Sequence, residues 1–157
     1  MKGGFEYMVE IRSFGSLLSF CLDLEEKLEN FYLELSTNKE NKTYTTLFSK
    51  LAKKNKRRGS LLERIRRENI NEMILQSING LIPGNNLTNI DSTIDLEFMD
   101  LLKKAIDFER SSSVFYLDAS NKASLILAES SRYFKKLSKE NEDRSLELEM
   151  IYSELNN

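Results

Sequence analysis

The chain has 157 residues and a mass of 18.3 kDa, enough to bury the core of one domain, so we expect residues 1–157 to form a single domain. It contains no histidine and one cysteine, Cys21, which excludes imidazole-based catalysis, an intramolecular disulfide and a thiolate metal cluster. Hydrophobic residues make up 40% and the net charge is -2, with only 6 Gly and 1 Pro, a composition that favours long helices and an all-α fold.

Apolar stripes mark the first two predicted helices. From Phe14 to Leu35, core-type residues recur in alternating steps of four and three, which is the spacing of one helix face. Polar residues 38–43 then predict a break. A second stripe of the same kind covers residues 44–65 and predicts a second helix, antiparallel to the first because the connection is short.

The segment from about residue 69 to residue 93 predicts a long crossover. It contains Pro83, the only proline, together with Gly80 and Gly84. We expect its apolar run, residues 74–81, to pack against the helices. Its length is sufficient to cover the whole length of a neighbouring helix.

Two further stripes predict the third and fourth helices. Ser92 and Asp95 resemble a capping box that opens the third helix, whose stripe covers residues 98–119. Polar residues 121–124 form the expected join to the fourth stripe, residues 130–151. This order of elements predicts a four-helix bundle with one long crossover between the second and third helices.

The first and third stripes are similar to each other, as are the second and fourth. An offset of 84 residues carries Glu25 onto Glu109 and Tyr32 onto Tyr116. An offset of 86 residues carries the second stripe onto the fourth, with Asn and Arg at the same places. We interpret the chain as a duplicated helix pair, an internal two-fold pseudo-repeat.

Each stripe is interrupted near its middle by polar residues that face the predicted core. These residues are Glu25, Asn55, Arg58, Glu109, Asn141 and Arg144. A charged side chain is almost never fully buried unless it is paired or binds a metal. We therefore expect a buried polar layer, made of these six residues, whose charges neutralise one another inside the bundle.

This pattern resembles the ferritin-like, rubrerythrin-type family of di-iron proteins, in which two helices each supply one Glu and the other two each supply Glu-x-x-His. Residues 24–32 and 105–116 are similar to the family's Glu followed seven residues later by Tyr. Residues 51–58 and 137–144 are similar to its leucine-alanine, acidic pair and histidine segment. The resemblance covers about residues 14–155 and implies the family's fold, an iron cofactor and oxidoreductase activity.

Four of the six implied metal ligands are replaced. Glu25 and Glu109 match the single Glu ligands, but in both Glu-x-x-His motifs Asn replaces Glu and Arg replaces His. Arginine stays protonated and has no lone pair for a metal. We therefore expect no cofactor and no catalysis, with each guanidinium in a charge-assisted pair, single or bidentate, with Glu25 or Glu109. Which arginine meets which glutamate stays open. Tyr32 and Tyr116 are expected to be neighbouring core residues with satisfied hydroxyls.

The predicted function is that of a metal-free structural or interaction module. One alternative is a di-metal iron oxidoreductase that uses Glu25 and Glu109 with an atypical set of oxygen ligands. Glu29, Glu140 and Glu142 lie off the core stripe, so they need a helix distortion such as a π-bulge to reach that metal. Another alternative is a binding module for an anion or a protein, through the arginine layer or the strongly basic second helix.

Charge and apolar patterning bear on location and partners. The start of the chain lacks a signal-peptide pattern and no apolar run has the length of a membrane span, so we expect a cytoplasmic protein without a membrane partner. The net charge of -2 and the lack of aromatics among the basic residues argue against nucleic acid. Apolar residues off the stripes predict a homodimer interface; they are Phe20, Leu24, Phe31, Leu146 and Met150.

Overall fold

The computed structural model describes residues 9–69, 75–90 and 96–157. Its long helices are α1 (Phe14–Ser36), α2 (Thr45–Glu68), α4 (Phe98–Ala123) and α5 (Ala128–Leu155). Its shorter elements are β1 (Ile11–Ser13), the 3-10 helix η1 (Lys42–Tyr44), β2 (Ser77–Leu81) and α3 (Asn85–Thr88). The predicted predominance of helix is confirmed, but the two-stranded sheet is not among the predicted elements. No described helix combines the length and the apolar character needed to cross a membrane.

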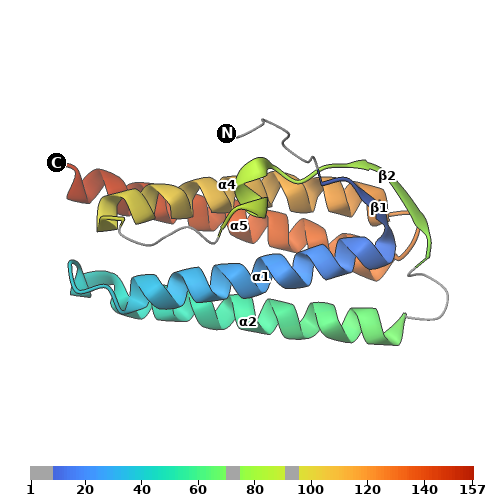
Figure 1. Cartoon of the computed structure of the whole chain (residues 1–157), viewed down its shortest axis with the longest axis horizontal. Helices are drawn as coiled ribbons and strands as arrows, with labels where there is room; N and C mark the ends of the chain where they lie inside the picture. Colours follow the sequence, from blue (N-terminus) through green and yellow to red (C-terminus); the bar gives the residue numbers. More distant parts are fainter. Residues whose placement is uncertain (1–8, 70–74, 91–95) are drawn as a thin grey trace, which may run out of the picture.

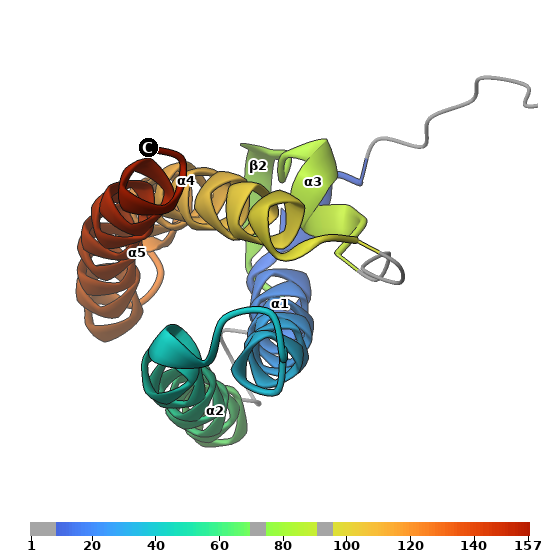
Figure 2. The same cartoon turned by 90° about the vertical axis from the view of Figure 1, so that its left-hand side faces the viewer.

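The long helices lie side by side as two antiparallel pairs, α1 with α2 and α4 with α5 (Figure 1). In the view along the helices, α1 lies next to α4, while α2 and α5 lie on the remaining side (Figure 2). The helix α2 ends at one end of this arrangement and α4 begins at the other, so the connection between them joins opposite ends (Figure 1). Every long helix therefore presents one face to the same interior.

Polar side chains cap the ends of α1 and α2. The Ser13 hydroxyl accepts a hydrogen bond from the Ser16 N–H at 3.1 Å and so satisfies one of the free donors at the start of α1. At the end of α2, the side-chain amide of Asn69 donates to the Ile65 carbonyl at 2.8 Å. These local contacts help to set where α1 begins and where α2 ends, each within a few residues of the limit of its stripe.

The join between the last two helices differs from the prediction. The sequence predicts it at residues 121–124, but α4 continues through Ala123 and the connection to α5 occupies residues 124–127. Ala123 is buried, so the apolar face of α4 extends beyond the polar residues that precede it. The capping box predicted at Ser92 and Asp95 lies outside the described residues.

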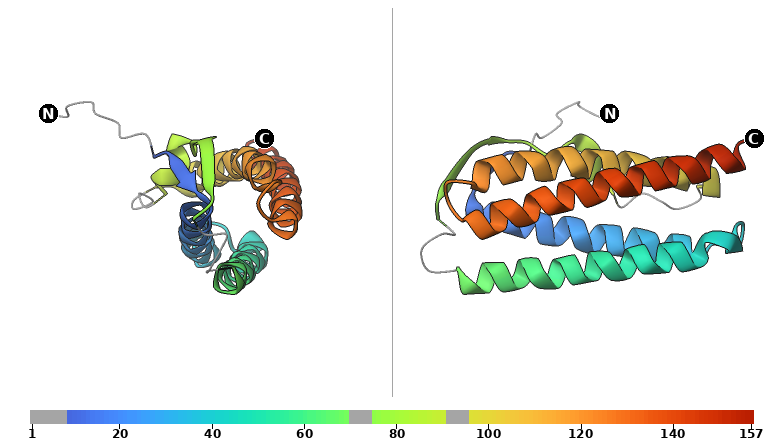
Figure 3. Two further views of the ribbon diagram at one scale, coloured as in Figure 1. Left: turned by 90° about the vertical axis from the view of Figure 1, so that its right-hand side faces the viewer. Right: turned by 180° about the vertical axis from the view of Figure 1, so that it is seen from behind.

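The strands β1 and β2 form an antiparallel pair beside the start of α1 (Figure 3). Ile11 pairs with Leu81, and both side chains are buried together with Ile78. Gly80 has a φ of 71°, a left-handed conformation that glycine adopts without strain. The predicted apolar run 74–81 therefore packs against the helices in part, as a strand; its first residue lies outside the described residues.

The two helix pairs meet through aromatic side chains. Phe31 of α1 lies with its ring centroid 5.2 Å from that of Phe108 of α4, and Phe20 lies 5.1 Å from Phe115. Leu24 is also buried. The assignment of Phe20, Leu24 and Phe31 to an exposed dimer interface is therefore wrong, because α1 contacts both α2 and α4 and needs a second apolar face.

Reciprocal serine hydrogen bonds join α4 to α5. The Ser113 and Ser138 hydroxyls each donate to the other residue's backbone carbonyl, at 2.9 and 2.7 Å. Ser120 and Ser131 make the same exchange, at 2.7 Å in both directions. These small side chains hold the two helices close together between the buried polar layer and the connection from α4 to α5.

Candidate functional site

The six residues of the buried polar layer lie near the middle of the four long helices. Asn55 and Asn141 are fully buried, as are both glutamates, and the two arginines are only 4% and 6% exposed. Each residue occupies a core position in a mostly apolar stripe, and this spacing carries the polar side chain into the interior. The fold thus brings all six predicted residues together.

Arg58 reaches from α2 to α5. Its Nη1 donates to Oδ1 of Asn141 at 2.7 Å, and its Nη2 donates to the Glu140 carboxylate at 2.9 Å. The same Nη1 lies 3.6 Å from Oε1 of Glu25 on α1. The guanidinium therefore has one buried carboxylate and one partly exposed carboxylate as neighbours.

Arg144 makes the corresponding contacts from α5. Its Nη1 donates to Oδ1 of Asn55 at 2.9 Å and lies 3.7 Å from Oε2 of Glu109. Its Nη2 is buried and has no hydrogen-bond partner among the described residues. The pairing that the sequence leaves open is thus Arg58 with Glu25 and Arg144 with Glu109, each within one helix pair.

The form of these ion pairs, single or bidentate, is also left open by the sequence. Neither contact is bidentate: each guanidinium lies 3.6 or 3.7 Å from its buried glutamate while its Nη1 donates to an asparagine carbonyl oxygen. Glu25 already accepts hydrogen bonds from Tyr116 and Asn55, which leaves little room for a two-bond arginine contact. Glu109 accepts one from Tyr32, and its Oε1 has no hydrogen-bond partner among the described residues. The asparagines are therefore central to the network and bridge the two helix pairs.

Two tyrosines hold the glutamate side chains in place. The Tyr116 hydroxyl donates to Oε2 of Glu25 at 2.5 Å, and the Tyr32 hydroxyl donates to Oε2 of Glu109 at 2.6 Å. The Asn55 amide donates to Oε1 of Glu25 at 3.1 Å. Burial, followed by the nearby glutamate charge, raises the pKa of both tyrosines well above its ordinary value, so both stay neutral donors.

Burial also changes the proton affinity of the charged groups. It raises the pKa of Glu25, although the Arg58 charge and the Tyr116 hydrogen bond oppose the rise. Burial alone lowers the pKa of Arg58, but the Glu25 and Glu109 carboxylates outweigh it and raise that pKa above its ordinary value. Burial raises the pKa of the Cys21 thiol well above its ordinary value, which keeps Cys21 a neutral core residue.

Replacing Glu25 with glutamine should remove a pH dependence of stability. The folded-state pKa of Glu25 is raised from 4.5, so its contribution to stability is complete below pH 4.5 and is lost as the pH rises through the folded-state pKa. The free energy of unfolding of the wild type, relative to Glu25→Gln, should therefore fall as the pH rises above 4.5. Urea denaturation at several pH values measures this difference.

The matched control is Glu26→Gln, at an exposed position on the same helix. Its stability should follow the wild type across the same pH range. Parallel curves for Glu25→Gln and the wild type would contradict the raised pKa.

The donor set does not fit a di-iron centre. Glu25 and Glu109 offer carboxylate oxygens, but each faces a guanidinium that has no lone pair for a metal and whose charge repels a cation. Of the further carboxylates considered, Glu142 is exposed and lies 3.8 Å from the Lys139 ammonium. Within residues 9–69, 75–90 and 96–157, no group of three or more His, Cys, Asp and Glu side chains is arranged to hold a metal.

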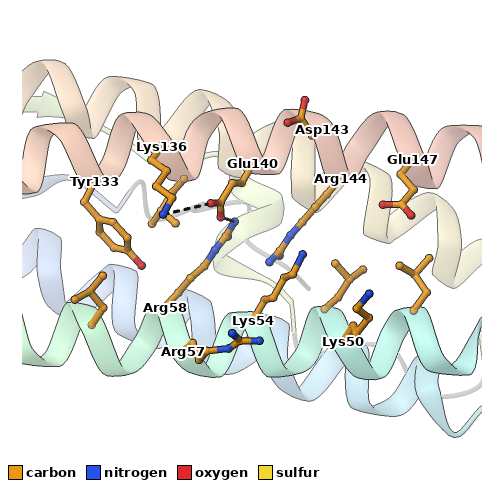
Figure 4. Close-up of a pocket in the computed structure, with 14 residues that line it drawn as sticks. Lys50, Lys54, Arg57, Arg58, Tyr133, Lys136, Glu140, Asp143, Arg144 and Glu147 are labelled. Atoms are coloured by element: carbon orange, nitrogen blue, oxygen red, sulfur yellow. Dashed lines mark hydrogen bonds and ion pairs between the residues drawn. The ribbon is translucent and has the colours of Figure 1, made fainter.

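Glu140 is a contact that sequence reasoning missed. It lies off the core stripe with its side chain 41% exposed, yet the long Arg58 side chain reaches it (Figure 4). The only signal in the sequence is its position next to Asn141, and the matching position on α2, 86 residues earlier, holds Lys54 with the opposite charge. The two halves of the network therefore differ in charge at this place.

No family model, curated protein or solved structure matches this chain. Its function is therefore inferred from the contacts of the buried polar layer and of the surface next to it.

Proposed function

We propose that this chain is a non-catalytic, metal-free protein of the ferritin-like, rubrerythrin type, in which Glu–Arg ion pairs replace the di-iron site. The observation that carries the proposal is the approach of Arg58 and Arg144 to within 3.6 and 3.7 Å of Glu25 and Glu109 inside the helices. Each guanidinium neutralises a carboxylate that a metal would need, and it cannot itself be a ligand.

Matched contacts support an internal two-fold pseudo-repeat. Tyr32 and Tyr116 each donate a hydrogen bond to the buried glutamate of the other helix pair. Arg58 and Arg144 each donate to the buried asparagine of the other pair. The rings of Tyr32 and Phe48 stack with centroids 6.3 Å apart, and those of Tyr116 and Phe134, at the corresponding positions, stack at 5.9 Å. These correspondences favour a duplicated helix pair with one long crossover, the arrangement implied by the ferritin-like resemblance.

We infer that the protein acts in the cytoplasm as a structural or interaction module and forms a homodimer. Leu146 and Met150 on α5 are 52% and 66% exposed, and Val114 on α4 is 67% exposed. Burying such side chains against a second copy removes apolar surface from water. Sedimentation velocity tests the dimer, and a monomer at micromolar concentration would contradict it.

Metal content tests the metal-free proposal. The protein produced in iron-rich medium and purified without a chelator should hold only substoichiometric iron after dialysis, because the guanidinium groups repel a cation. About two irons per chain, the content of a ferritin-like di-iron site, would contradict the proposal. That result would instead favour the alternative, an iron oxidoreductase that uses Glu25 and Glu109 with atypical oxygen ligands.

A further inference from the structure

The two buried arginines have different surroundings in the groove between α2 and α5. The groove has a volume of about 550 Å³, and both Arg58 and Arg144 line it. Beside Arg58, the groove contains Glu140, which accepts a hydrogen bond from Nη2 at 2.9 Å and lies 4.0 Å from the Lys136 ammonium. Beside Arg144, Nη2 is buried and no described residue accepts a hydrogen bond from it.

Lys54, a cation, occupies the position on α2 that corresponds to Glu140 on α5. Residues 54 and 58 of α2 correspond to residues 140 and 144 of α5 under the offset of 86, so Lys54 is placed toward Arg144 as Glu140 is toward Arg58. The Arg144 side chain points from α5 toward α2, and its guanidinium ends beside the Lys54 side chain (Figure 4). Two cationic groups therefore converge on one place in the groove.

The carboxylates that line the groove do not supply an acceptor to Arg144 Nη2. Six cationic side chains and three carboxylates line the groove. Glu140 is engaged by Arg58 at 2.9 Å, and Asp143 lies 3.4 Å from the Lys139 ammonium. Glu147, the third, lies farther along α5, on the side of Lys50 (Figure 4). A buried guanidinium N–H without an acceptor is costly, so an acceptor supplied from outside the chain is favoured here.

We propose that this groove binds a phosphate group, free or carried by a small organic molecule, whose oxygens accept hydrogen bonds from Arg144 Nη2 and the Lys54 ammonium. Guanidinium and ammonium groups both bind phosphate oxygens through charge-assisted hydrogen bonds. Lys54 is exposed and has a long flexible stem, so it can turn to admit an oxygen to the guanidinium. This role goes beyond the structural module proposed above.

The size and lining of the groove also leave room for an organic body. Its volume of about 550 Å³ falls within the range of small-molecule sites, roughly 300–1,000 Å³. Leu47 and Leu51 line it next to the two lysines of α2, and they offer an apolar surface to that body. We therefore expect a phosphomonoester with an apolar group to bind more tightly than inorganic phosphate.

Calorimetric titration with inorganic phosphate and with phenyl phosphate, at constant ionic strength, tests the site. Saturable binding of both is expected. The variant Lys54→Glu gives Arg144 a carboxylate neighbour, as Glu140 is for Arg58, and removes the Lys54 ammonium. It should weaken binding by about tenfold or more, which corresponds to the loss of one charge-assisted hydrogen bond. Without ligand, this variant should melt at a higher temperature than the wild type because Nη2 gains an acceptor.

The matched control is Lys53→Glu, the same change of charge at the neighbouring exposed residue, which does not line the groove. Its phosphate affinity should stay within about twofold of the wild type, because exposed charges are screened by salt. Equal weakening by both variants would overturn the site in favour of general attraction to basic α2. Unchanged affinity in Lys54→Glu, or no saturable binding by the wild type, would overturn it as well. Binding of inorganic phosphate alone supports the site and limits its ligand to free phosphate.

Discussion

Replacing Arg144 with alanine should lower the free energy of unfolding by about 3–5 kcal/mol, because it leaves a buried carboxylate without its cation. Glu109 is fully buried, and Nη1 of Arg144 lies 3.7 Å from its Oε2. The substitution also removes the 2.9 Å hydrogen bond to Asn55. Arg58→Ala should fall in the same range, since it removes the corresponding partner of Glu25. Urea denaturation at neutral pH measures these losses.

An exposed arginine provides the control for this measurement. Arg64 on α2 lies 3.8 Å from Glu68, with both side chains more than half exposed. Arg64→Ala should change stability by less than about 0.5 kcal/mol, because exposed ion pairs contribute little. A change that small in Arg144→Ala would contradict the buried role of Arg144 in the ion pair.

A fourfold variant that restores the ligands implied by the family resemblance should gain metal binding. It combines Asn55→Glu, Arg58→His, Asn141→Glu and Arg144→His. The four changes replace two cations with two neutral imidazoles and add two carboxylates, a donor set suited to a divalent metal. Without metal, four close carboxylates should destabilise the variant. Added Mn²⁺ should then raise its melting temperature strongly, with about 4 kcal/mol gained at a thousandfold excess over Kd.

Two matched proteins show whether the arginines are the barrier to metal. The wild type should not respond to Mn²⁺. The double variant Asn55→Glu with Asn141→Glu has four carboxylates but keeps Arg58 and Arg144, so it should respond far less than the fourfold variant. Stoichiometric metal in the double variant would show that the guanidinium groups do not exclude a cation. No response in the fourfold variant would contradict the proposed relation of the layer to a di-metal site.

Helices and burial are largely predictable from this sequence, because both depend on local spacing. The apolar stripe of residues 14–35 matches α1 closely, and the break at residues 38–43 lies in the connection to α2. A residue at a core position of a stripe is carried inward whatever its chemistry. All six residues of the buried polar layer were therefore expected inside, and all six are buried.

Spacing says less about how wide the buried face of a helix is. Phe20 and Phe31 lie off the stripe of α1, and their contact with α4 depends on a helix pair distant in sequence. Glu140 is also off its stripe, but the length of the Arg58 side chain brings the two together at 2.9 Å. The apolar residues off the α1 stripe indicate a second contact face but not that α4 covers it, and the Glu140 contact leaves no signal in the periodicity, because both depend on which helix is the neighbour.

Periodicity alone shows where the helices form and which face of each is buried, and burial of charge requires the glutamates and arginines to neutralise one another. The packing of the helices is needed to show that Arg58 meets Glu25, that the asparagines accept the guanidinium hydrogen bonds, and that residues 11 and 81 pair in a small sheet. The physical reason is that periodicity fixes a side chain's direction around its own helix axis. The shift and rotation of one helix against another, which set every distance between helices, come from packing of the whole core.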